Sequence, residues 1–231
     1  MPRLVFATTA TGVPGGAQGY EDAIASRAAA ALAHLEPGWR VDRAVVRSLR
    51  SSLPGTRRLP VSRVARWAGR PRAALGRVFY PAGVLVHRTS LELPPAPFEV
   101  VTLHDLVAWR YPDESAPVAA AAAELRDAAA VVCVSRHTAE QASELLGVTD
   151  PVVVPNGIDG RFFDARPLAP DTLAGLGLPA PFVLHVGGAS ARKNLAGLAE
   201  AWRRLAATHP ALHLALAGPP HPARDALFAG M

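Results

Sequence analysis

Residues 131–154 read VVCVSRHTAEQASELLGVTDPVVV, and this stretch decides the expected fold class. The apolar run Val131–Val134 leads into a helical pattern at His137–Leu146, and a second β-branched run follows at Val152–Val154. Continuous apolar strands joined by helices are typical of a parallel sheet that is covered on both faces. We therefore expect an α/β protein. Ligands of such sheets collect beyond the carboxyl ends of the strands, so the functional residues are expected in the loops that leave them.

The same alternation continues on both sides of this stretch. Further strands are expected at Arg3–Ala7, Val41–Val46, Val84–His87, Glu99–Leu103, Phe182–Val186 and Leu212–Ala217. Further helices are expected at Gly19–Leu35, Glu114–Asp127 and Asn194–Thr208. Residues 160–180 are rich in proline and glycine, which indicates an interdomain linker. We expect a domain over residues 1–165, a linker over 166–180 and an incomplete second domain over 181–231, because a complete domain usually needs about 100 residues or more.

The charge of the chain is unevenly distributed. The net charge is +5, yet the segment Arg40–Arg88 alone contains twelve arginines and one acid, Asp42. Such a block indicates an acidic partner, either a phosphate-bearing substrate or an anionic membrane. Nucleic acid ranks last, because no zinc-finger spacing or aromatic RNA-binding motif accompanies the charge.

A membrane partner has some support within this block. Arginines recur there at helical spacing beside Trp67, namely Arg63, Arg66, Arg70 and Arg77. This pattern predicts either peripheral docking on anionic lipid or a merely solvated basic face, and Pro71 is expected to break the helix. Charged residues interrupt the alanine-rich stretches, so neither is expected to span a membrane. We expect a cytoplasmic protein, with possible placement at the inner face of the plasma membrane.

Cysteine usage excludes disulfide bonds within one chain. Cys133 is the single cysteine and stands in an apolar run, so we expect a buried structural thiol.

A glycine-rich loop follows the first expected strand and contains Gly15 and Gly16. Backbone N–H groups at a helix start can bind phosphate, although an unliganded turn explains the loop equally well. The spacing differs from the dinucleotide fingerprint, and Asp42 opens the second strand rather than closing it. A nicotinamide-dependent oxidoreductase is therefore disfavoured.

Three later strand ends carry polar residues that are expected to line a cleft. His104 and Asp105 follow one strand, and a histidine there can donate a hydrogen bond to a substrate hydroxyl; the alternative is a histidine held by Asp105 for structural reasons. Ser135 is most simply a helix N-cap. Asn156 and Gly157 predict a tight turn that would also face the cleft.

The strongest local pattern is at residues 186–195. A strand ends in paired glycines, Gly187 and Gly188, and the cations Arg192 and Lys193 stand at the start of a helix. Cations at that end oppose the helix dipole, an arrangement that an anion would relieve, whereas two solvated charges are the alternative. Lys193 is the only lysine beside twenty-three arginines. We interpret the pair as a site for a leaving diphosphate.

Five segments, taken together and in this order, resemble glycosyltransferase family 4, particularly its bacterial mannosyltransferase-like members. They are the Gly15–Gly16 loop, His104–Leu106, Val134–Ser135, Pro155–Asp159 and Arg192–Leu195. The resemblance implies a GT-B fold of two Rossmann-like domains, the first on the acceptor side and the second on the donor side. It implies retaining transfer of a hexose, with mannose the first guess, from a nucleotide-diphosphate sugar to a glycan or lipid-linked acceptor.

The resemblance also assigns roles to matching positions. Arg192 and Lys193 would hold the donor diphosphate and stabilise it as leaving group, and Gly188 would border it. Gly15 and Gly16 would approach the phosphate or the sugar, and His104 would lie near the reacting sugar. No metal and no separate cofactor are expected.

One part of the family pattern is not found. The family carries two glutamates separated by seven residues that bind the donor, and no such pair occurs in residues 1–231. We therefore expect these residues alone to be inactive or weakly active, and a catalytically inactive binding module is the alternative function.

Overall fold

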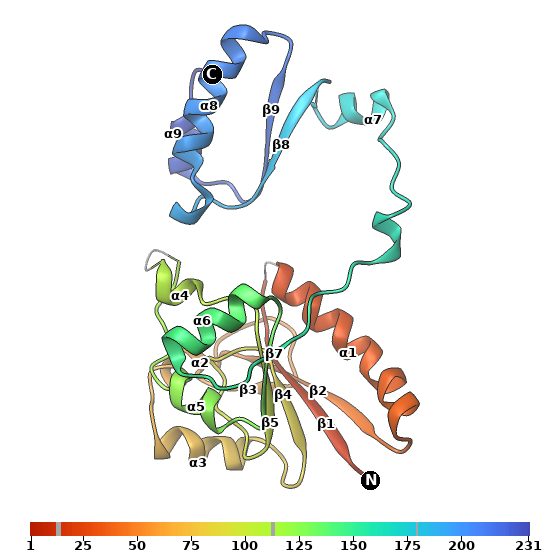
Figure 1. Ribbon diagram of the computed structural model, residues 1–231, viewed down its shortest axis with the longest axis vertical. Coiled ribbons are helices and arrows are strands. Elements are labelled where there is room, and N and C mark those ends of the chain that lie inside the picture. Colours follow the sequence, from red (N-terminus) through yellow and green to blue (C-terminus); the bar gives the residue numbers. More distant parts are fainter. Residues whose placement is uncertain (13–14, 112–113, 179) are drawn as a thin grey trace. The chain divides into compact units, whose positions relative to one another are not determined.

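A seven-stranded parallel sheet organises the first of two structural units (Figure 1). The computed structural model describes residues 1–12, 15–111, 114–178 and 180–231. The first unit comprises Met1–Arg110 and Ala116–Gly157, and the second comprises Tyr111–Ser115 and Ile158–Met231.

The sheet has the strand order β3-β2-β1-β4-β5-β6-β7, and all its neighbours are parallel. The strands are β1 (Arg3–Thr9), β2 (Arg40–Arg47), β3 (Arg57–Arg58), β4 (Leu85–Arg88), β5 (Glu99–Leu103), β6 (Ala130–Cys133) and β7 (Val152–Val153). The strand order reverses between β1 and β4, so the carboxyl ends of these two strands mark the topological switch point. The expected α/β class with a Rossmann-like parallel sheet is confirmed.

Helices cover the two faces of this sheet unequally (Figure 1). The long helix α1 (Gly16–Leu35) lies on one face. The other face carries α2 (Val61–Val64), α3 (Arg70–Phe79), α5 (Ala121–Asp127) and α6 (Arg136–Leu146), and the short α4 (Val107–Arg110) follows β5. On this second face Val5 and Val86 pack against Val64, and Val101 packs with Leu125. Cys133 is buried there as a free thiol, as expected.

A buried network of ion pairs lies within the second face. Arg88 contacts both Glu99 and Glu124, with Nη2 to Glu99 Oε1 at 2.7 Å and Nη1 to Glu124 Oε2 at 3.0 Å. Arg72 Nε donates to Glu124 Oε1 at 2.5 Å, and its Nη2 donates to the carbonyl of Leu93 at 2.6 Å. Two arginines thus balance two glutamates, which is the condition for burying charge.

The second unit contains a two-stranded parallel sheet of β8 (Phe182–Val186) and β9 (His213–Ala217). Its helices are α7 (Pro170–Gly175), α8 (Leu195–Thr208) and α9 (Pro222–Phe228), with 3₁₀ turns η1 (Gly160–Phe162) and η2 (Ala191–Lys193). Leu195, Ala199 and Trp202 of α8 are buried, whereas Leu184 and Val186 of β8 are exposed.

Several expected elements need correction. The helix expected at Glu114–Asp127 begins only at Ala121. Pro117 disfavours helical backbone at Ala116, so a helix that begins at Glu114 could not continue through it. The expected linker contains η1 and α7, the latter with Pro170 at its start, where proline is tolerated. The arginines at helical spacing do not share one helix: Arg63 lies on α2, Arg66 in the turn after it, and Arg70 and Arg77 on α3. Pro71 stands in the first turn of α3 and does not break it. None of the described helices is long and apolar enough to cross a lipid bilayer.

Candidate functional site

The glycine-rich loop reaches the sheet edge at the switch point. Gly15 is the N-cap of α1, and its N–H donates to Gln18 Oε1 at 3.0 Å. The helix therefore begins at Gly16, three residues before the expected start. A methyl group added at Gly16 would meet no atom of the described residues within 4 Å, so the protein leaves this position open. Val13 and Pro14 of the same loop lie outside the described residues.

His104 follows β5 at the same edge, and the imidazole packs perpendicular to the Tyr20 ring with 4.7 Å between ring centroids. Its Nε2 is buried and has no hydrogen-bond partner within the described part of the chain. Burial lowers the pKa of His104, and the charge of Asp105 opposes that shift only in part. The side chain is therefore a neutral imidazole at pH 7.

A polar array supports this corner of the site. Thr102 Oγ1 lies 2.7 Å from His87 Nε2 and 3.2 Å from the Tyr20 hydroxyl. Burial, together with the nearby His104, lowers the pKa of His87 to about 4, so His87 is also neutral. No sequence pattern singles out Tyr20 or Thr102, because a tyrosine in a helix and a threonine in a strand are ordinary there.

A buried carboxyl group at the switch point was also missed. Glu21 of α1 is 3% exposed and lies 2.6 Å from Thr89 Oγ1, which follows β4. Burial raises the pKa of Glu21 despite the hydrogen bond with Thr89. No sequence pattern marks this residue, since only the pairing of β1 with β4 brings Thr89 to α1.

The remaining predicted residues of the first unit mostly serve the backbone. Asp105 Oδ1 accepts from Val107 N at 3.1 Å rather than holding His104. Ser135 caps α6 by accepting from Thr138 N at 3.0 Å, which confirms the capping prediction. The tight turn expected at Asn156 and Gly157 is wrong: neither residue has positive φ, and the chain is irregular and exposed there as it leaves β7. Their place in a cleft remains a prediction.

In the second unit, Lys193 lies over a tight glycine contact at the carboxyl ends of β8 and β9. Gly187 N donates to the Ala217 carbonyl at 2.9 Å, and a methyl group at Gly218 would fall 2.1 Å from the Gly187 carbonyl oxygen. A methyl group at Gly187 would lie 3.4 Å from Lys193 Cε and 3.5 Å from the His185 ring. Lys193 and His185 therefore flank the same backbone position. Gly188 beside them is open.

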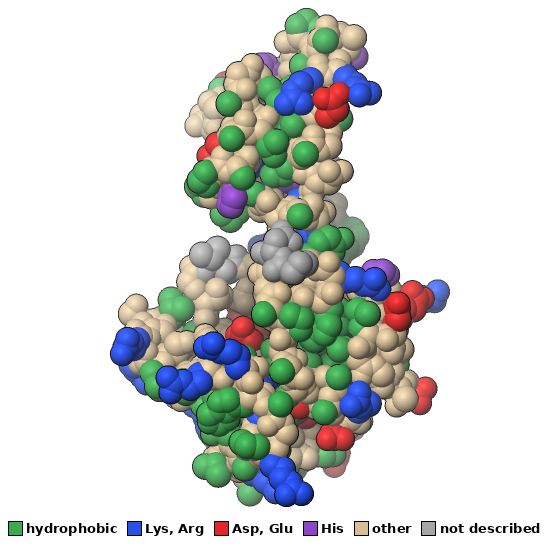
Figure 2. Space-filling view, turned by 90° about the vertical axis from the view of Figure 1, so that its left-hand side faces the viewer, with side chains coloured by type: hydrophobic (Ala, Val, Ile, Leu, Met, Phe, Trp, Pro, Cys, Tyr) green, Lys and Arg blue, Asp and Glu red, His purple; other side chains and the backbone are tan. Residues whose placement is uncertain are grey.

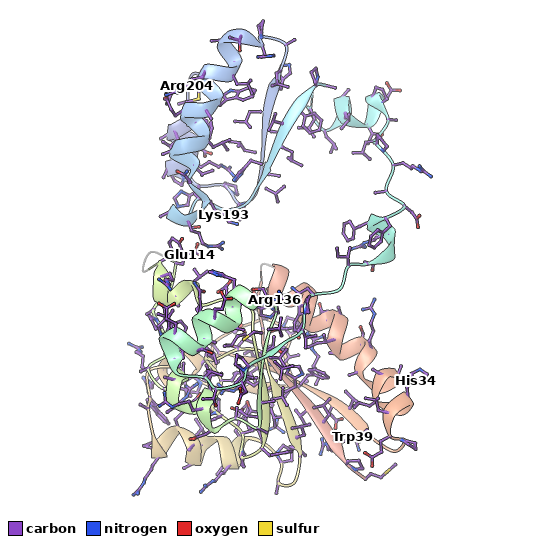
Figure 3. The ribbon with its side chains drawn as sticks, viewed as in Figure 1. His34, Trp39, Glu114, Arg136, Lys193 and Arg204 are labelled. Atoms are coloured by element: carbon purple, nitrogen blue, oxygen red, sulfur yellow. The ribbon has the colours of Figure 1, made fainter. Side chains whose placement is uncertain are left out.

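Arg192 and Lys193 form η2 immediately before α8, as Figure 3 shows for Lys193. Asn194 adopts a left-handed conformation and caps α8, its Oδ1 accepting from Gly197 N at 3.2 Å. Arg192 Nε donates to Glu114 Oε1 at 2.7 Å, so this cation already attracts a carboxylate. His185 was missed by sequence reasoning, and its Nδ1 is buried with no partner among the described residues.

The arginine block proves to be largely structural. Arg72 and Arg88 are buried, Arg40 and Arg43 pair with acids, and others donate to backbone carbonyls, namely Arg47, Arg57 and Arg58. The positive surface is therefore smaller than the sequence implies. Asp42 pairs with Arg3 and Arg40, and this hydrogen bonding lowers the pKa of Asp42. Because Asp42 lies near the start of β2, it does not face the carboxyl ends of the strands.

Comparison with known proteins adds a second line of evidence. A profile of Glycosyltransferase Family 4 matches residues 17–161, more than half of the sequence. The chain belongs to glycosyltransferase family 4. A search of curated proteins finds no match.

Solved structures similar to this family 4 chain share its fold. One is a putative UDP-N-acetylglucosamine 2-epimerase from Listeria monocytogenes, with a TM-score of 0.56, 13% identity, and coverage of 99% of this chain and 66% of that one. Another is S. aureus MnaA in a co-structure with UDP, with a TM-score of 0.55, 14% identity, and coverage of 98% and 65%. The chain spans about two thirds of the length of these proteins. At this identity the similarity shows the GT-B type of fold alone.

The family match covers only part of the site residues. His104, Asp105, Ser135, Asn156 and Gly157 of this glycosyltransferase family 4 chain lie inside it. Gly15 and Gly16 stand just before it, and Gly188, Arg192 and Lys193 lie beyond it. Within the described residues, no three side chains of His, Cys, Asp or Glu gather as metal ligands.

Proposed function

We propose that the chain takes part in retaining transfer of a hexose from a nucleotide-diphosphate sugar to a glycan or lipid-linked acceptor. Membership of glycosyltransferase family 4 supports the reaction class. The structural neighbour solved with UDP supports a nucleotide sugar as donor. Mannose is the first sugar to test, and the binding needs no divalent metal in this proposal.

The observation that carries the proposal is the position of Lys193 against Gly187. Parallel strands β8 and β9 end in two glycines that touch backbone to backbone. Lys193 and His185 flank Gly187, and Arg224 Nη1 donates to the Gly218 carbonyl at 3.4 Å. A compact ammonium beside bare backbone is the arrangement that a diphosphate can approach closely. Arg192, the neighbouring residue, adds a second donor with planar geometry.

This arrangement suits the chemistry of a leaving diphosphate. Cleavage of the bond between the sugar and the diphosphate leaves negative charge on the phosphate oxygens, and fixed cations stabilise that charge as it develops. The neutral imidazole of His104 suits a different role, a hydrogen bond to a sugar hydroxyl that does not compete with the cations for the phosphates.

The proposal is tested by nucleotide binding to the protein with and without its two cations. Calorimetry with UDP and GDP is expected to show binding that Lys193→Ala and Arg192→Ala each weaken roughly 10- to 100-fold, the range for a lost charge-assisted hydrogen bond. Arg204→Ala is the matched control, because Arg204 is an exposed arginine of α8 that pairs with Glu200. Equal affinity in all four proteins would refute the diphosphate site. Undiminished binding in EDTA is expected, and its loss would refute metal independence.

Turnover separates the transferase from the alternative, an inactive binding module. A transferase releases nucleoside diphosphate from the sugar nucleotide in the presence of acceptor, whereas a binding module retains the donor intact. Residues 1–231 alone are expected to transfer weakly, if at all. Rapid transfer by this chain would contradict that expectation.

A peripheral contact with anionic membrane is a further part of the proposal. The arginines at helical spacing remain exposed without an acidic partner in the described residues, namely Arg63, Arg66, Arg70 and Arg77. Trp67 is 39% exposed beside them. Figure 2 shows basic side chains gathered on the face of the first unit that carries α2 and α3.

Liposome co-sedimentation tests this contact. Binding is expected to rise with the fraction of anionic lipid and to fall with salt, because each arginine near the surface contributes about 1 kcal/mol through screened attraction. Arg63→Gln with Arg66→Gln should weaken it, whereas Arg203→Gln, an exposed arginine of α8, should not. Binding that ignores lipid charge would exclude the contact.

A further inference from the structure

The polar array beneath His104 assigns a role to a residue that no motif marks. We propose that Tyr20 of α1 is a positioning residue. Its hydroxyl is held by Thr102, which His87 holds in turn, and its ring fixes the His104 imidazole so that Nδ1, carrying the proton, meets the substrate. The inference rests on the proposed function for its catalytic meaning, and on the geometry of the first unit for its structure.

The Tyr20 side chain contacts Thr102 through its hydroxyl and His104 through its ring. Its hydroxyl lies 3.2 Å from Thr102 Oγ1, and its ring stands at 87° to His104 with centroids 4.7 Å apart. A tyrosine anchored at its hydroxyl cannot swing about the bond to its ring, so its edge-to-face contact limits the imidazole to one orientation. Tyr20 thus links Thr102, which lies on β5, to His104, which follows this strand at the sheet edge.

The protons of the array can be arranged in two ways. Thr102 has one hydroxyl proton and two neighbours, His87 Nε2 and the Tyr20 oxygen. If His87 Nε2 carries a proton, it donates to Thr102, which donates to Tyr20; if not, Tyr20 donates to Thr102, which donates to His87. Both arrangements satisfy the contacts because His87 is neutral, and a charged His87 would place a cation beside His104.

The burial of Nε2 determines the tautomer of His104. Its Nε2 is enclosed without a hydrogen-bond partner in the described residues, although the residue as a whole is only half-buried. An unpaired N–H in a protein interior is rarer and more costly than an unpaired acceptor lone pair. The proton therefore belongs on Nδ1, which leaves Nε2 as the buried acceptor. Nδ1 can then donate to a hydroxyl of a bound sugar.

Imidazole NMR of the unliganded chain tests the structural half of the inference. Long-range ¹H–¹⁵N spectra separate the two neutral tautomers, and His104→Gln and His87→Gln assign the signals. The wild type is expected to show His104 as one neutral Nδ1–H tautomer, and Tyr20→Leu is expected to give averaged nitrogen shifts. An Nε2–H tautomer in the wild type, or unchanged shifts in Tyr20→Leu, would overturn the inference.

Kinetics of sugar transfer test the catalytic half. Tyr20→Leu is expected to lower kcat roughly 10- to 100-fold while KM for the donor changes by less than about threefold, since a misplaced group affects the reacting geometry more than binding. Tyr20→Phe, which keeps the ring, should recover most of the rate. Phe163→Leu, which trims an exposed ring of the second unit, is the control. Equal loss in Tyr20→Phe and Tyr20→Leu would show that the ring does not position His104.

The design separates failure of this inference from failure of the proposed function. The NMR result needs no sugar donor, so it decides the array even if the protein transfers no sugar. If Tyr20→Leu does not fold, Thr102→Val removes the anchor with nearly the same volume and is expected to mobilise the His104 signal. Unchanged His104 shifts in folded Thr102→Val would refute the anchoring step.

Discussion

The two faces of the seven-stranded sheet handle buried polarity in opposite ways. On the face covered by α2, α3, α5 and α6, the polar side chains are full charges in matched pairs, with Arg72 and Arg88 against Glu99 and Glu124. On the face covered by α1, neutral polar side chains are linked in single file, from His87 through Thr102 to Tyr20. This face also holds the buried carboxyl group of Glu21, which accepts from Thr89 Oγ1. The first network ends within the core, whereas the second ends at the sheet edge beside His104.

This difference indicates a division of labour. Paired charges in a dry interior are costly to separate, so they fix the loops between β4 and β5 and tie α3 to α5. Neutral hydroxyl and imidazole groups cost less to bury and can reverse their hydrogen bonds, which suits a site that receives a ligand. The charged face is therefore expected to control stability, and the neutral face to control chemistry.

The largest expected effect comes from breaking the charged face. Glu124→Gln removes the partner of both Arg72 and Arg88, and the stranded guanidinium of Arg72 should lower the free energy of unfolding by about 3–5 kcal/mol. Urea unfolding measures the change. Glu200→Gln breaks exposed pairs on α8 and should cost less than about 1 kcal/mol. A loss no greater than that of Glu200→Gln would show that the network is not a stability element.

The next effect is a pH dependence specific to the neutral face. The pKa of His87 falls from 6.5 to about 4 in the folded protein, so between these values the unfolded chain binds more protons and stability falls as the pH is lowered. The loss approaches about 3 kcal/mol near pH 4. His87→Gln should therefore lose less stability than wild type between pH 6.5 and pH 4.5 in urea unfolding. The exposed His34→Gln should follow the wild type, and identical curves for all three would disprove a buried neutral His87.

A smaller effect is expected from the centre of the array. Thr102→Val leaves His87 Nε2 and the Tyr20 hydroxyl without this partner and should cost about 1–2 kcal/mol, well below the cost of Glu124→Gln. Thr208→Val, at the exposed end of α8, serves as the matched control for stability measured by urea unfolding. A cost equal to that of Glu124→Gln would remove the contrast between the two faces.

The smallest effect separates ligand approach from folding at the start of α1. Gly16→Ala and Gly19→Ala both place a methyl group in open space, so each should leave the stability unchanged or raise it by about 0.5–1 kcal/mol. Only Gly16→Ala is expected to weaken binding of the sugar nucleotide, because only Gly16 stands at the N-terminus of the helix. Melting temperatures measure the stability of each variant, and calorimetry measures its affinity for the sugar nucleotide. Equal donor affinity in the two variants would argue against phosphate approach at Gly16.

Sequence reasoning located most strands and the longer helices because their signals are local. Alternating apolar runs gave Glu99–Leu103 and Phe182–Val186 at their observed bounds, and Ser135 was identified as a cap from its place before a helix. The helix start at Ala121 and the irregular chain at Asn156 were missed, since both depend on local backbone preferences that apolar periodicity does not report.

The arginine block shows the limit most clearly. As a sequence it is a run of positive charge, and the expected consequence was a basic surface. The acidic partners of its buried arginines lie elsewhere along the chain: Arg72 and Glu124 are separated by fifty-two positions, and Arg88 and Glu124 by thirty-six. Arg72 and Arg88 are buried in ion pairs within the core, and composition alone cannot reveal this.

By itself, the sequence determined the α/β class and the order of strands and helices, because hydrophobic periodicity and glycine placement act over a few residues. For the same reason it placed His104 after a strand and Arg192 and Lys193 before a helix. Only the tertiary structure decided which side chains meet. Strand order brings Thr89 to Glu21 and Thr102 to Tyr20, and burial then sets the protonation of His87 and His104, since desolvation is a property of surroundings and not of neighbours in the chain.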